Sequence, residues 1–432
     1  MPAAGCRRQP RRARAGTGAS RTPYNGGPFG SPIFLSASAL HSASPDALLE
    51  RLAASGLRGR GGGWFEAARK WKAVRAEGGA PLVVANGAEG EPGSFKDRYV
   101  MQRRPADVVA GLALAARAVG AREAVVFLKG SFDRPAAALS GALAAASLDG
   151  LSVEVRRGDD GYVTGEETAL LEALEGRRPW PRPKPPLPAA VGFEGRPTLV
   201  QNVETLAHVP AAVSDPEAYR RDETTLVTVW GDVRRPGVRE VRLGTPLRRV
   251  IDEQAGGPTE DVGLVFPGGP AGAPLGADDL DVPLDPEALR ARGTALATGA
   301  VLVVGASACP LAVAASVAGF FERENCGQCP PCAVGTASLA RILRAVESGG
   351  SHPRDLRDLH EVAGFMSGHG YCAHCRTAAT VATAMARGFA EAVDAHVSGG
   401  ACPWPERRHP DPFAPGSPER AALDAAVQEQ LR

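Results

Sequence analysis

Residues 324–332 read ENCGQCPPC and bring three cysteines, Cys326, Cys329 and Cys332, into one run with two-residue gaps. A second pair, Cys372 and Cys375, follows further along the chain. Such gaps let three thiolates of one loop bind one face of a 4Fe-4S cubane, whose fourth iron takes a ligand from elsewhere. Zinc is the main alternative, although its usual signature is two separated CxxC pairs. The spacing therefore favours an iron–sulfur cluster, with Cys372 or Cys375 as the fourth ligand.

The remaining cysteines carry a weaker signal. Cys309 and Cys402 stand alone, and we expect them to be packing residues rather than ligands. Because the cysteines are clustered, a disulfide framework is disfavoured and a reducing cytoplasm is expected. No apolar run reaches about 18 residues, so no transmembrane helix is predicted.

Length and composition describe a globular chain of several domains. Its 432 residues predict about two to four domains, and a hydrophobic content of 44% supports packed cores. The net charge of +1 gives no bias towards nucleic acid or anionic membranes. Residues 1–43 are rich in Pro, Gly, Ser and Arg, and we expect them to form a disordered basic tail.

Residues 44–222 alternate strand and helix candidates, which predicts a layered α/β domain. The first helix begins after Ser44, a plausible N-cap that is followed by Pro45. Strands are expected over 81–86, 123–130 and 151–158, and helices over 106–119 and 134–146.

The rest of the chain predicts two smaller units. Residues 223–310 combine β-rich runs with an amphipathic helix expected over 243–257, which indicates a small α+β module. Residues 311–402 are predicted to form a helical bundle that carries the cysteines in its turns. Residues 403–432 are expected to be a C-terminal tail with a short helix from Ser417.

Glycine-rich and acidic segments lie in the predicted α/β domain. Residues 56–65 read GLRGRGGGWF, where glycines permit close backbone approach to a phosphate or flat ring and Arg58, Arg60 and Lys70 supply charge. Three further segments precede the cysteine run: ANGAEGEPGSFKDRYVM (85–101), GYVTGEETALLEALEG (161–176) and RPKPPLPAAVGFEGRPTLVQNVETLAHVP (182–210). The acids of the second can be explained by a helix N-terminus alone, but three such segments before a cluster motif are hard to explain as caps and turns.

The order of these segments resembles one family closely. The motifs GLRGRGGGWF, NGAEGEPGSFKDR, GYVTGEETALLEALEGRRP, KPPLPA, GRPTLVQNVETLAHVP and ENCGQCPPC are similar to those of the NADH-binding flavin subunit of respiratory complex I. The same family includes diaphorase subunits of soluble hydrogenases and formate dehydrogenases. The resemblance covers about residues 41–402.

The resemblance implies a multidomain fold and an electron-transfer function. The implied architecture is an FMN- and NADH-binding α/β domain over 44–222, a ubiquitin-like SLBB-type domain over 223–310, and a helical 4Fe-4S domain over 311–402. The implied activity is that of an NADH dehydrogenase-like oxidoreductase, in which hydride passes from NAD(P)H to FMN and single electrons pass to the cluster.

The resemblance also implies the roles of individual residues. The catalytic residues implied in the flavin–nicotinamide cavity are Glu89, Glu91 and Glu167. The cofactor-binding residues are Gly59, Arg60, Gly62, Phe65, Lys70, Asn86, Tyr162, Gly165, Glu166 and Asn202. The cluster ligands are Cys326, Cys329, Cys332 and Cys372, since Cys372 aligns with the start of a Cys-Ala-Leu-Gly-like turn in the family.

Departures from the family pattern gather where the nicotinamide nucleotide is expected. Trp64 stands in place of a glycine, and Ala73 and Leu187 replace two phenylalanines that sandwich the adenine in the family. Each missing aromatic contact removes about 0.5–1.5 kcal/mol of stacking beyond burial. The acidic segment has Ala88 and Gly90 around Glu89, so that one family carboxylate is missing.

Three functional hypotheses follow. The first is an oxidoreductase that uses NAD(P)H, FMN and a 4Fe-4S cluster; the second is an FMN/4Fe-4S electron carrier with another donor, such as ferredoxin. The third is a non-enzymatic remnant with a structural cluster or zinc. The resemblance implies a 2Fe-2S or other electron-transfer protein as partner, no nucleic acid, and a place in the cytoplasm, either free or peripheral to a membrane complex.

Overall fold

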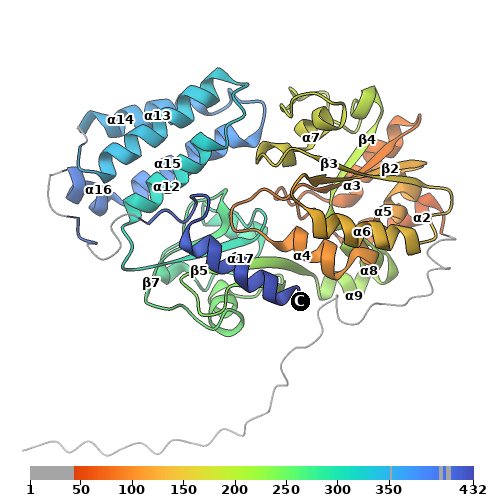
Figure 1. The fold of residues 1–432 in the computed structure, drawn as a ribbon, viewed down its shortest axis with the longest axis horizontal. Coiled ribbons are helices and arrows are strands. Elements are labelled where there is room, and N and C mark those ends of the chain that lie inside the picture. The colour runs from red at the N-terminus through yellow and green to blue at the C-terminus, as the bar shows by residue number, and fades with distance from the viewer. Residues whose placement is uncertain (1–42, 351–352, 398–401, 405–409) are drawn as a thin grey trace, which may run out of the picture.

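The computed structural model describes residues 43–350, 353–397, 402–404 and 410–432. The basic tail predicted for residues 1–43 falls outside this part of the chain, apart from Ala43. Three groups of elements lie side by side in Figure 1: an α/β unit in red to yellow-green, a second sheet in green and a helical bundle in cyan and blue.

The first sheet confirms the predicted strand and helix alternation. Its four parallel strands lie in the order β3-β2-β1-β4. The strands are β1 (Leu82–Gly87), β2 (Glu123–Lys129), β3 (Ser152–Gly158) and β4 (Thr198–Asn202). The helices are α2 (Pro45–Ser55), α3 (Ala67–Glu77), α4 (Lys96–Arg103), α5 (Pro105–Val119), α6 (Asp133–Ala145), α7 (Glu167–Leu174), α8 (Val203–Ser214) and α9 (Pro216–Arg221).

Alternate residues of the central strands pack into two separate cores. Val83 and Ala85 of β1 belong to the large core that includes α2, α3 and α5. Leu82 and Val84 point to the opposite face, where they pack with Leu170 of α7. Both faces of the parallel sheet are therefore covered, as its continuous apolar runs require.

The strand order determines where a ligand can bind. The chain passes from β1 to β2 and β3 on one side and then returns to place β4 on the other side of β1. In open parallel sheets, ligands bind outside the carboxyl ends of the strands at such a reversal. Asn86 of β1 and Asn202 of β4 are register partners at this edge.

The second sheet is mixed and has the order β6-β5-β8-β7. Its strands are β5 (Thr224–Gly231), β6 (Gly237–Arg242), β7 (Val262–Pro270) and β8 (Ala300–Gly305), with α11 (Pro286–Ala291) between β7 and β8. The amphipathic helix predicted over 243–257 is wrong in extent. Instead, α10 (Leu247–Arg249) leads into a short π-helical turn, Val250–Gln254, because Pro246 precedes it and Gly256 and Gly257 follow with positive φ.

The helical bundle consists of α12 (Pro310–Arg323), α13 (Pro330–Glu347), α14 (Pro353–Met366), α15 (Ala373–Gly388) and α16 (Ala390–Val397). The prediction that turns carry all the cysteines is partly wrong. Pro330 and Pro331 begin α13, so Cys332 lies in its first turn. Cys375 lies likewise in the first turn of α15, which is preceded by Cys372.

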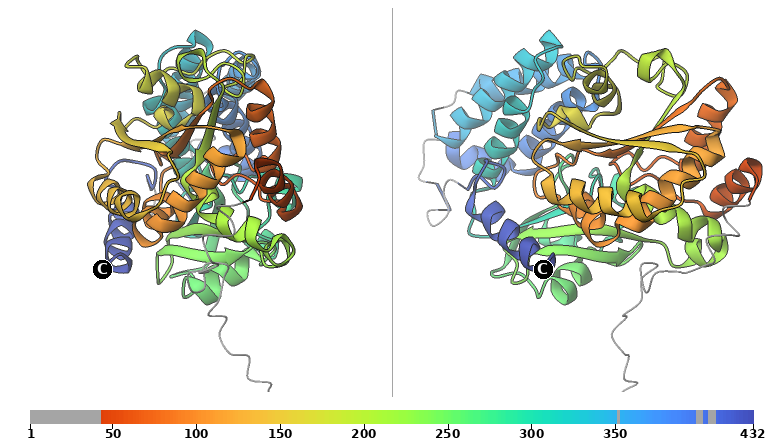
Figure 2. Two further views of the ribbon diagram at one scale, coloured as in Figure 1. Left: turned by 90° about the vertical axis from the view of Figure 1, so that its right-hand side faces the viewer. Right: turned by 45° about the vertical axis from the view of Figure 1, so that its right-hand side comes forward.

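The predicted C-terminal tail is instead a packed part of the fold. Helix α17 (Pro418–Gln430) begins after Ser417, as expected, and contacts β5 and β6; Figure 2 shows it in dark blue beside the green sheet. Leu423 and Val427 are fully buried. The Gln430 side chain accepts a hydrogen bond from the Val238 N–H (2.9 Å) and donates one to the Val238 carbonyl (3.3 Å), as a neighbouring strand would.

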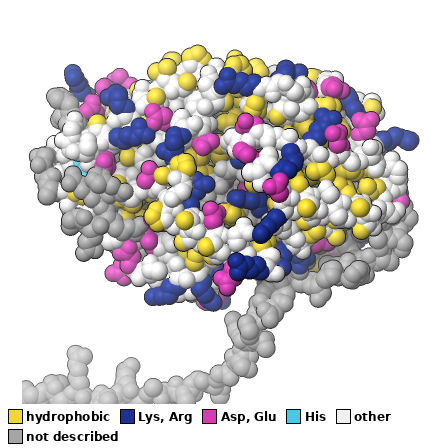
Figure 3. Space-filling view, viewed as in Figure 1, with side chains coloured by type: hydrophobic (Ala, Val, Ile, Leu, Met, Phe, Trp, Pro, Cys, Tyr) yellow, Lys and Arg dark blue, Asp and Glu magenta, His cyan; other side chains and the backbone are white. Residues whose placement is uncertain are grey.

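The surface of the molecule carries mixed charges. Acidic and basic side chains are interspersed over the face seen in Figure 3, in agreement with the near-zero net charge. Among the described residues, no helix combines the length and apolar character needed to cross a membrane.

Candidate functional site

Two cavities open at the carboxyl ends of β1 and β4. The outer cavity has a volume of about 560 Å³ and the inner cavity about 240 Å³. Residues that line both are Gly61, Asn86, Gly165, Glu166 and Asn202. The Asn86 amide donates to the Gly165 carbonyl (2.9 Å), and the Asn202 amide donates to Asp97 Oδ2 (2.9 Å). These bonds fix both asparagines between the two cavities.

The outer cavity joins the glycine-rich segment to the acidic helix α7. Its wall includes Gly59, Phe65 and Lys70 on one side and Glu167, Lys184 and Leu187 on the other. Lys70 Nζ lies 2.7 Å from Glu167 Oε2, and Lys184 Nζ lies 2.6 Å from Glu166 Oε1. Burial opposes ionisation of Glu167, but Lys70 and Lys184 outweigh it and lower the pKa of this carboxyl. The outer cavity therefore presents paired charges of both signs.

The inner cavity contains a carboxyl group with an unusual pKa. Burial raises the pKa of Glu91 to about 8, although the Tyr162 hydroxyl donates to its Oε2 at 3.1 Å and opposes the shift. Burial, with the Glu91 charge, also raises the pKa of Tyr162 well above its ordinary value. Within the described residues, Oε1 of Glu91 is buried without a hydrogen-bond partner. Such an atom is a ready partner for a polar ligand.

Glu89 differs from Glu91 although both line the inner cavity. Its carboxylate accepts hydrogen bonds from the Ser94 hydroxyl (2.6 Å) and from the Asp97 N–H (3.1 Å). Burial opposes its ionisation, but Arg98, 2.9 Å away, and Lys96 outweigh burial and lower its pKa. Glu89 thus holds the start of α4 in place, and Glu91 is the predicted catalytic acid that has an unused oxygen.

The prediction that Arg60 binds a cofactor with its side chain is wrong. The guanidinium is buried away from both cavities and donates to Glu223 Oε1 (2.8 Å) and the Thr224 carbonyl (3.0 Å). It connects the α/β unit to the start of β5. Gly62 is absent from the lining of both cavities and faces Thr298, with φ of +103°. Neighbouring residues of this glycine-rich turn face different parts of the structure, and the spacing of the glycines in the sequence did not predict which residues face the cavities.

Trp64 joins the α/β unit to the second sheet. Its indole N–H donates to the Ala297 carbonyl (2.8 Å), and its ring is 8% exposed and belongs to the core of the second unit. The Arg60 guanidinium lies 4.5 Å from the ring centroid. Trp64 adopts φ of +52°, which glycine reaches without strain, so inter-domain packing must hold it. Trp64 also contributes to the lining of the outer cavity, so the residue lies both in this core and at the cavity wall.

Five cysteines converge on one small cavity beside the inner cavity. They are Cys326, Cys329, Cys332, Cys372 and Cys375. The Asn325 amide lies 3.1 Å from Cys332 Sγ, and the Cys326 carbonyl accepts from the Trp180 indole (3.1 Å). Cys372 and His374 line both the cysteine cavity and the inner cavity. The structure thus brings the triplet and the distant pair together at the edge of the predicted flavin site.

Cys375 has a more enclosed position than Cys372. Its side chain is 1% exposed, and only Cys372 of the pair also lines the inner cavity. Cys375 Sγ also lies 3.3 Å from the Met366 carbonyl oxygen. This arrangement favours Cys372.

Three residues that line these cavities were not among the predicted site residues. Lys184 lies in the KPPLPA motif, which could have identified it. His374 follows Cys372 closely, and its Nε2 bonds the Phe321 carbonyl at 2.8 Å, so that Nδ1 is left without a partner in the described part of the chain. Thr298 reaches the inner cavity from the loop before β8, and no local pattern marks it.

Comparisons with known proteins agree with this arrangement. Family models match the Nuo51 FMN-binding domain over residues 52–211, the SLBB domain over 226–271 and the NADH-ubiquinone oxidoreductase-F iron–sulfur binding region over 312–396. The chain is 36% identical to the F 2 subunit of NADH-quinone oxidoreductase in Rhizobium meliloti (strain 1021) over 388 residues, which are 85% of this chain and 92% of that protein. The chain belongs to the family of NADH-quinone oxidoreductase F subunits.

Another NADH-quinone oxidoreductase F subunit is similar over somewhat less of the chain. The F subunit of Escherichia coli (strain K12) is 34% identical over 362 residues, covering 78% of this chain and 81% of that protein. Among solved structures, the air-oxidized NAD+-reducing NiFe hydrogenase gives a TM-score of 0.78 at 32% identity, over 91% of this chain and 68% of that chain. The H2-reduced state gives 0.76 at 34%, over 83% and 63%. The fold class, with its FMN-binding, SLBB and iron–sulfur regions, is confirmed.

Proposed function

We propose that this chain oxidises NAD(P)H through FMN in the two strand-end cavities and passes single electrons to a 4Fe-4S cluster in the cysteine cavity. One observation carries the proposal: Cys372 and His374 line both the inner cavity and the cysteine cavity. A flavin in the inner cavity would therefore border the cluster ligands directly. FMN supplies the conversion of a two-electron hydride donor into one-electron transfer.

The residues present fit FMN. Gly165 lines both cavities, and an added Cβ there would lie 2.8 Å from the Ala88 carbonyl oxygen, so a larger residue would displace the wall. Glu91 Oε1 supplies an unused acceptor in the inner cavity. The chain residues that would hold the flavin are Gly59, Lys70, Asn86, Tyr162, Gly165, Glu166 and Asn202, with Gly62 shaping the turn.

The nicotinamide nucleotide would enter through the outer cavity. Lys184, paired with Glu166 and Glu167, supplies a cation at its wall, and Phe65 offers a ring that is 53% exposed. Ala73 and Leu187 provide apolar contact without aromatic stacking. Glu167, already paired with two lysines, would orient ligand groups rather than remove a proton.

The proposal is tested by the visible spectrum of anaerobically purified protein before and after addition of NADH or NADPH. We expect flavin absorption that bleaches with one of these nucleotides, followed by reduction of the cluster. Flavin that neither nucleotide bleaches would instead support an FMN/4Fe-4S electron carrier with another donor. The absence of the two adenine-stacking phenylalanines favours this alternative. A protein that binds neither flavin nor iron after reconstitution would support the structural remnant.

Leu187→Phe should strengthen NADH binding. Leu187 is 55% exposed at the wall of the outer cavity, where the family has a phenylalanine. A restored stacking contact of about 0.5–1.5 kcal/mol lowers KM by about two- to tenfold, with kcat nearly unchanged. The measurement is NADH-dependent reduction of an artificial acceptor, with Val191→Phe as the control for a surface aromatic, since Val191 is exposed outside the lining. An unchanged KM would indicate that the adenine of NADH does not bind beside residue 187.

Glu91→Gln should flatten the pH dependence of stability in protein freed of flavin. The folded-state pKa of about 8 exceeds the ordinary 4.5, so the folded protein holds a proton that the unfolded chain has released between these values. The free energy of unfolding therefore falls by about 1.4 kcal/mol per pH unit as the pH rises towards 8. Urea unfolding of both proteins at about pH 6 and about pH 8 measures the difference; equal slopes would contradict the shifted pKa.

The proposal extends to partners and location. The family members named above are subunits of larger enzymes by their names, so we propose an electron-transfer protein, such as a 2Fe-2S subunit, as the acceptor. We also propose a cytoplasmic location, either free or peripheral to a membrane complex. It is supported by the seven described cysteines, all of which are free thiols.

A further inference from the structure

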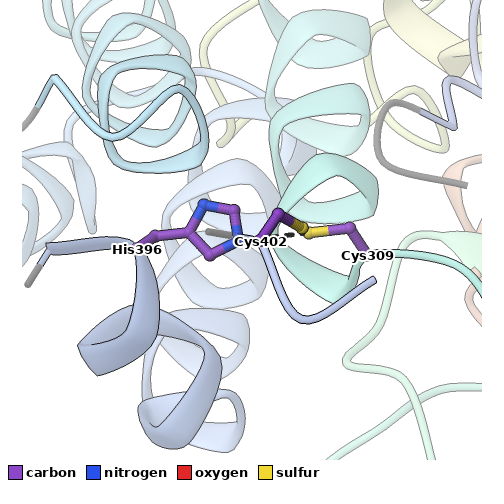
Figure 4. A group of neighbouring side chains, drawn as sticks. All are labelled: Cys309, His396 and Cys402. Carbon is purple, nitrogen blue, oxygen red and sulfur yellow. Dashed lines mark hydrogen bonds between the residues drawn. The ribbon is translucent and has the colours of Figure 1, made fainter. Parts of the chain in front are cut away.

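Three residues that are distant in sequence meet at the base of the helical bundle. Cys309, His396 and Cys402 each offer a ligand atom, and these atoms all lie within 4.8 Å of one another (Figure 4). Cys309 and Cys402, which are isolated in the sequence and were predicted to be packing residues, are brought together by the fold. None of the three lines the cysteine cavity of the proposed cluster.

The His396 ring is oriented as a metal ligand would be. Its Nδ1 lies 2.7 Å from the Glu347 carbonyl oxygen, which can only accept, so Nδ1 carries the proton. Nε2 therefore presents its lone pair, and it lies 3.7 Å from Cys309 Sγ. Metal-binding histidines commonly have their second nitrogen fixed by a carbonyl in this way. The ring is 3% exposed, so this orientation is held inside the protein.

The two cysteines suit a soft or borderline cation. Cys309 is fully buried at the N-cap position of α12, next to the His396 ring. Thiolate sulfur and imidazole nitrogen are the ligands that zinc prefers. Cys402 is only half-buried, which leaves the group approachable from solvent.

We propose that Cys309, His396 and Cys402 form a second metal centre, which binds one Zn²⁺. Two thiolates and one imidazole are a common part of tetrahedral zinc sites, with a water or another ligand in the fourth position. The site is independent of the proposed cluster and flavin. A Cys309–Cys402 disulfide is the rival product of the same proximity, but it would not explain the oriented His396 ring.

The position of the site suggests a structural role. Cys309 is the N-cap residue of α12, in the connection from β8 of the second sheet. His396 lies on α16, the last helix of the bundle, and Cys402 lies between α16 and α17 along the chain. A bound ion would therefore connect the bundle to the chain segment that covers β5 and β6. Loss of zinc should loosen this segment and lower the melting temperature without removing the cluster.

Metal analysis of the full chain, purified anaerobically and dialysed against EDTA, tests the site. We expect one zinc per chain, with Zn–S distances of about 2.3 Å and a Zn–N distance of about 2.0–2.1 Å from the zinc X-ray absorption edge. Cys402→Ser, at the half-buried position, and His396→Ala should each lose the zinc and keep the iron. Cys326→Ser is the reciprocal control and should lose iron and keep zinc.

Three results would overturn the proposal. They are zinc at trace level in the dialysed protein, zinc that disappears with Cys326→Ser but persists in Cys402→Ser, and a Cys309–Cys402 disulfide found by alkylation and mass spectrometry of anaerobically handled protein. Because zinc and iron are counted separately, failure of the zinc site is distinguishable from failure of the proposed electron-transfer function.

Discussion

Cys372→Ser should abolish the 4Fe-4S cluster, whereas Cys375→Ser should retain it. Cys372 precedes α15 at the border of the cysteine and inner cavities, and we propose that it supplies the fourth thiolate. Serine oxygen is a poor substitute for a soft thiolate on iron. We expect Cys372→Ser to lose most of its iron and the low-temperature EPR signal of the reduced cluster.

Cys375→Ser is the matched control, because it removes a thiol from the same cavity and the same helix turn. Cys375 is 1% exposed, and its Sγ lies 3.3 Å from the Met366 carbonyl oxygen, so serine should change packing slightly and leave the iron content near that of the parent. In the Cys372→Ser protein, flavin should still bleach with the nucleotide, while electron transfer to an external one-electron acceptor slows. Iron retained by Cys372→Ser and lost by Cys375→Ser would reverse the ligand assignment.

Lys96→Met should be the most destabilising single substitution outside the cluster. Lys96 Nζ is buried between Asp97 Oδ1 (2.7 Å) and Glu204 Oε2 (2.9 Å). Burial opposes the charge on Lys96, yet the two carboxylates outweigh it and raise its pKa. Removing the ammonium leaves two buried carboxylates without their counter-charge, at a cost of about 3–5 kcal/mol.

The effect of Lys96→Met should extend beyond the pair, because Glu204 Oε1 also accepts from the Leu226 N–H (2.7 Å) and the Thr225 hydroxyl (3.0 Å) on β5. The measurement is the urea midpoint of the purified protein, followed by flavin fluorescence and by far-UV circular dichroism. Lys72→Met, at an exposed position of α3, is the control, with a change within about 0.5 kcal/mol. Equal midpoints for both variants would show that other groups compensate the charges of the Asp97 and Glu204 carboxylates.

Local patterns in the sequence were sufficient to predict most elements of the fold. The α2 cap at Ser44, the strands β1 to β3 and the start of α17 follow from capping residues and apolar periodicity, which act over a few residues. The cysteine triplet likewise indicated its chemistry by spacing alone. The α10 region failed because Pro246 and two glycines outweighed an amphipathic pattern.

The sequence could not indicate the direction of side chains in the glycine-rich turn. Arg60 and Lys70 looked equivalent as charges near a phosphate, yet Arg60 is buried against Glu223 and Lys70 faces the outer cavity. The difference depends on β5, which lies more than a hundred residues further along the chain.

The sequence by itself therefore determined the α/β unit, the small α+β unit and the helical unit through short-range patterns, and its resemblance to the family indicated the SLBB-type and cluster-binding character of the last two. Only the tertiary structure decided which distant residues share a site: Cys372 beside the inner cavity, Trp64 in the core of the second unit, and Cys309 with His396 and Cys402. Such contacts form when separate elements pack, and residues that meet only in this way carry no mutual signal along the chain.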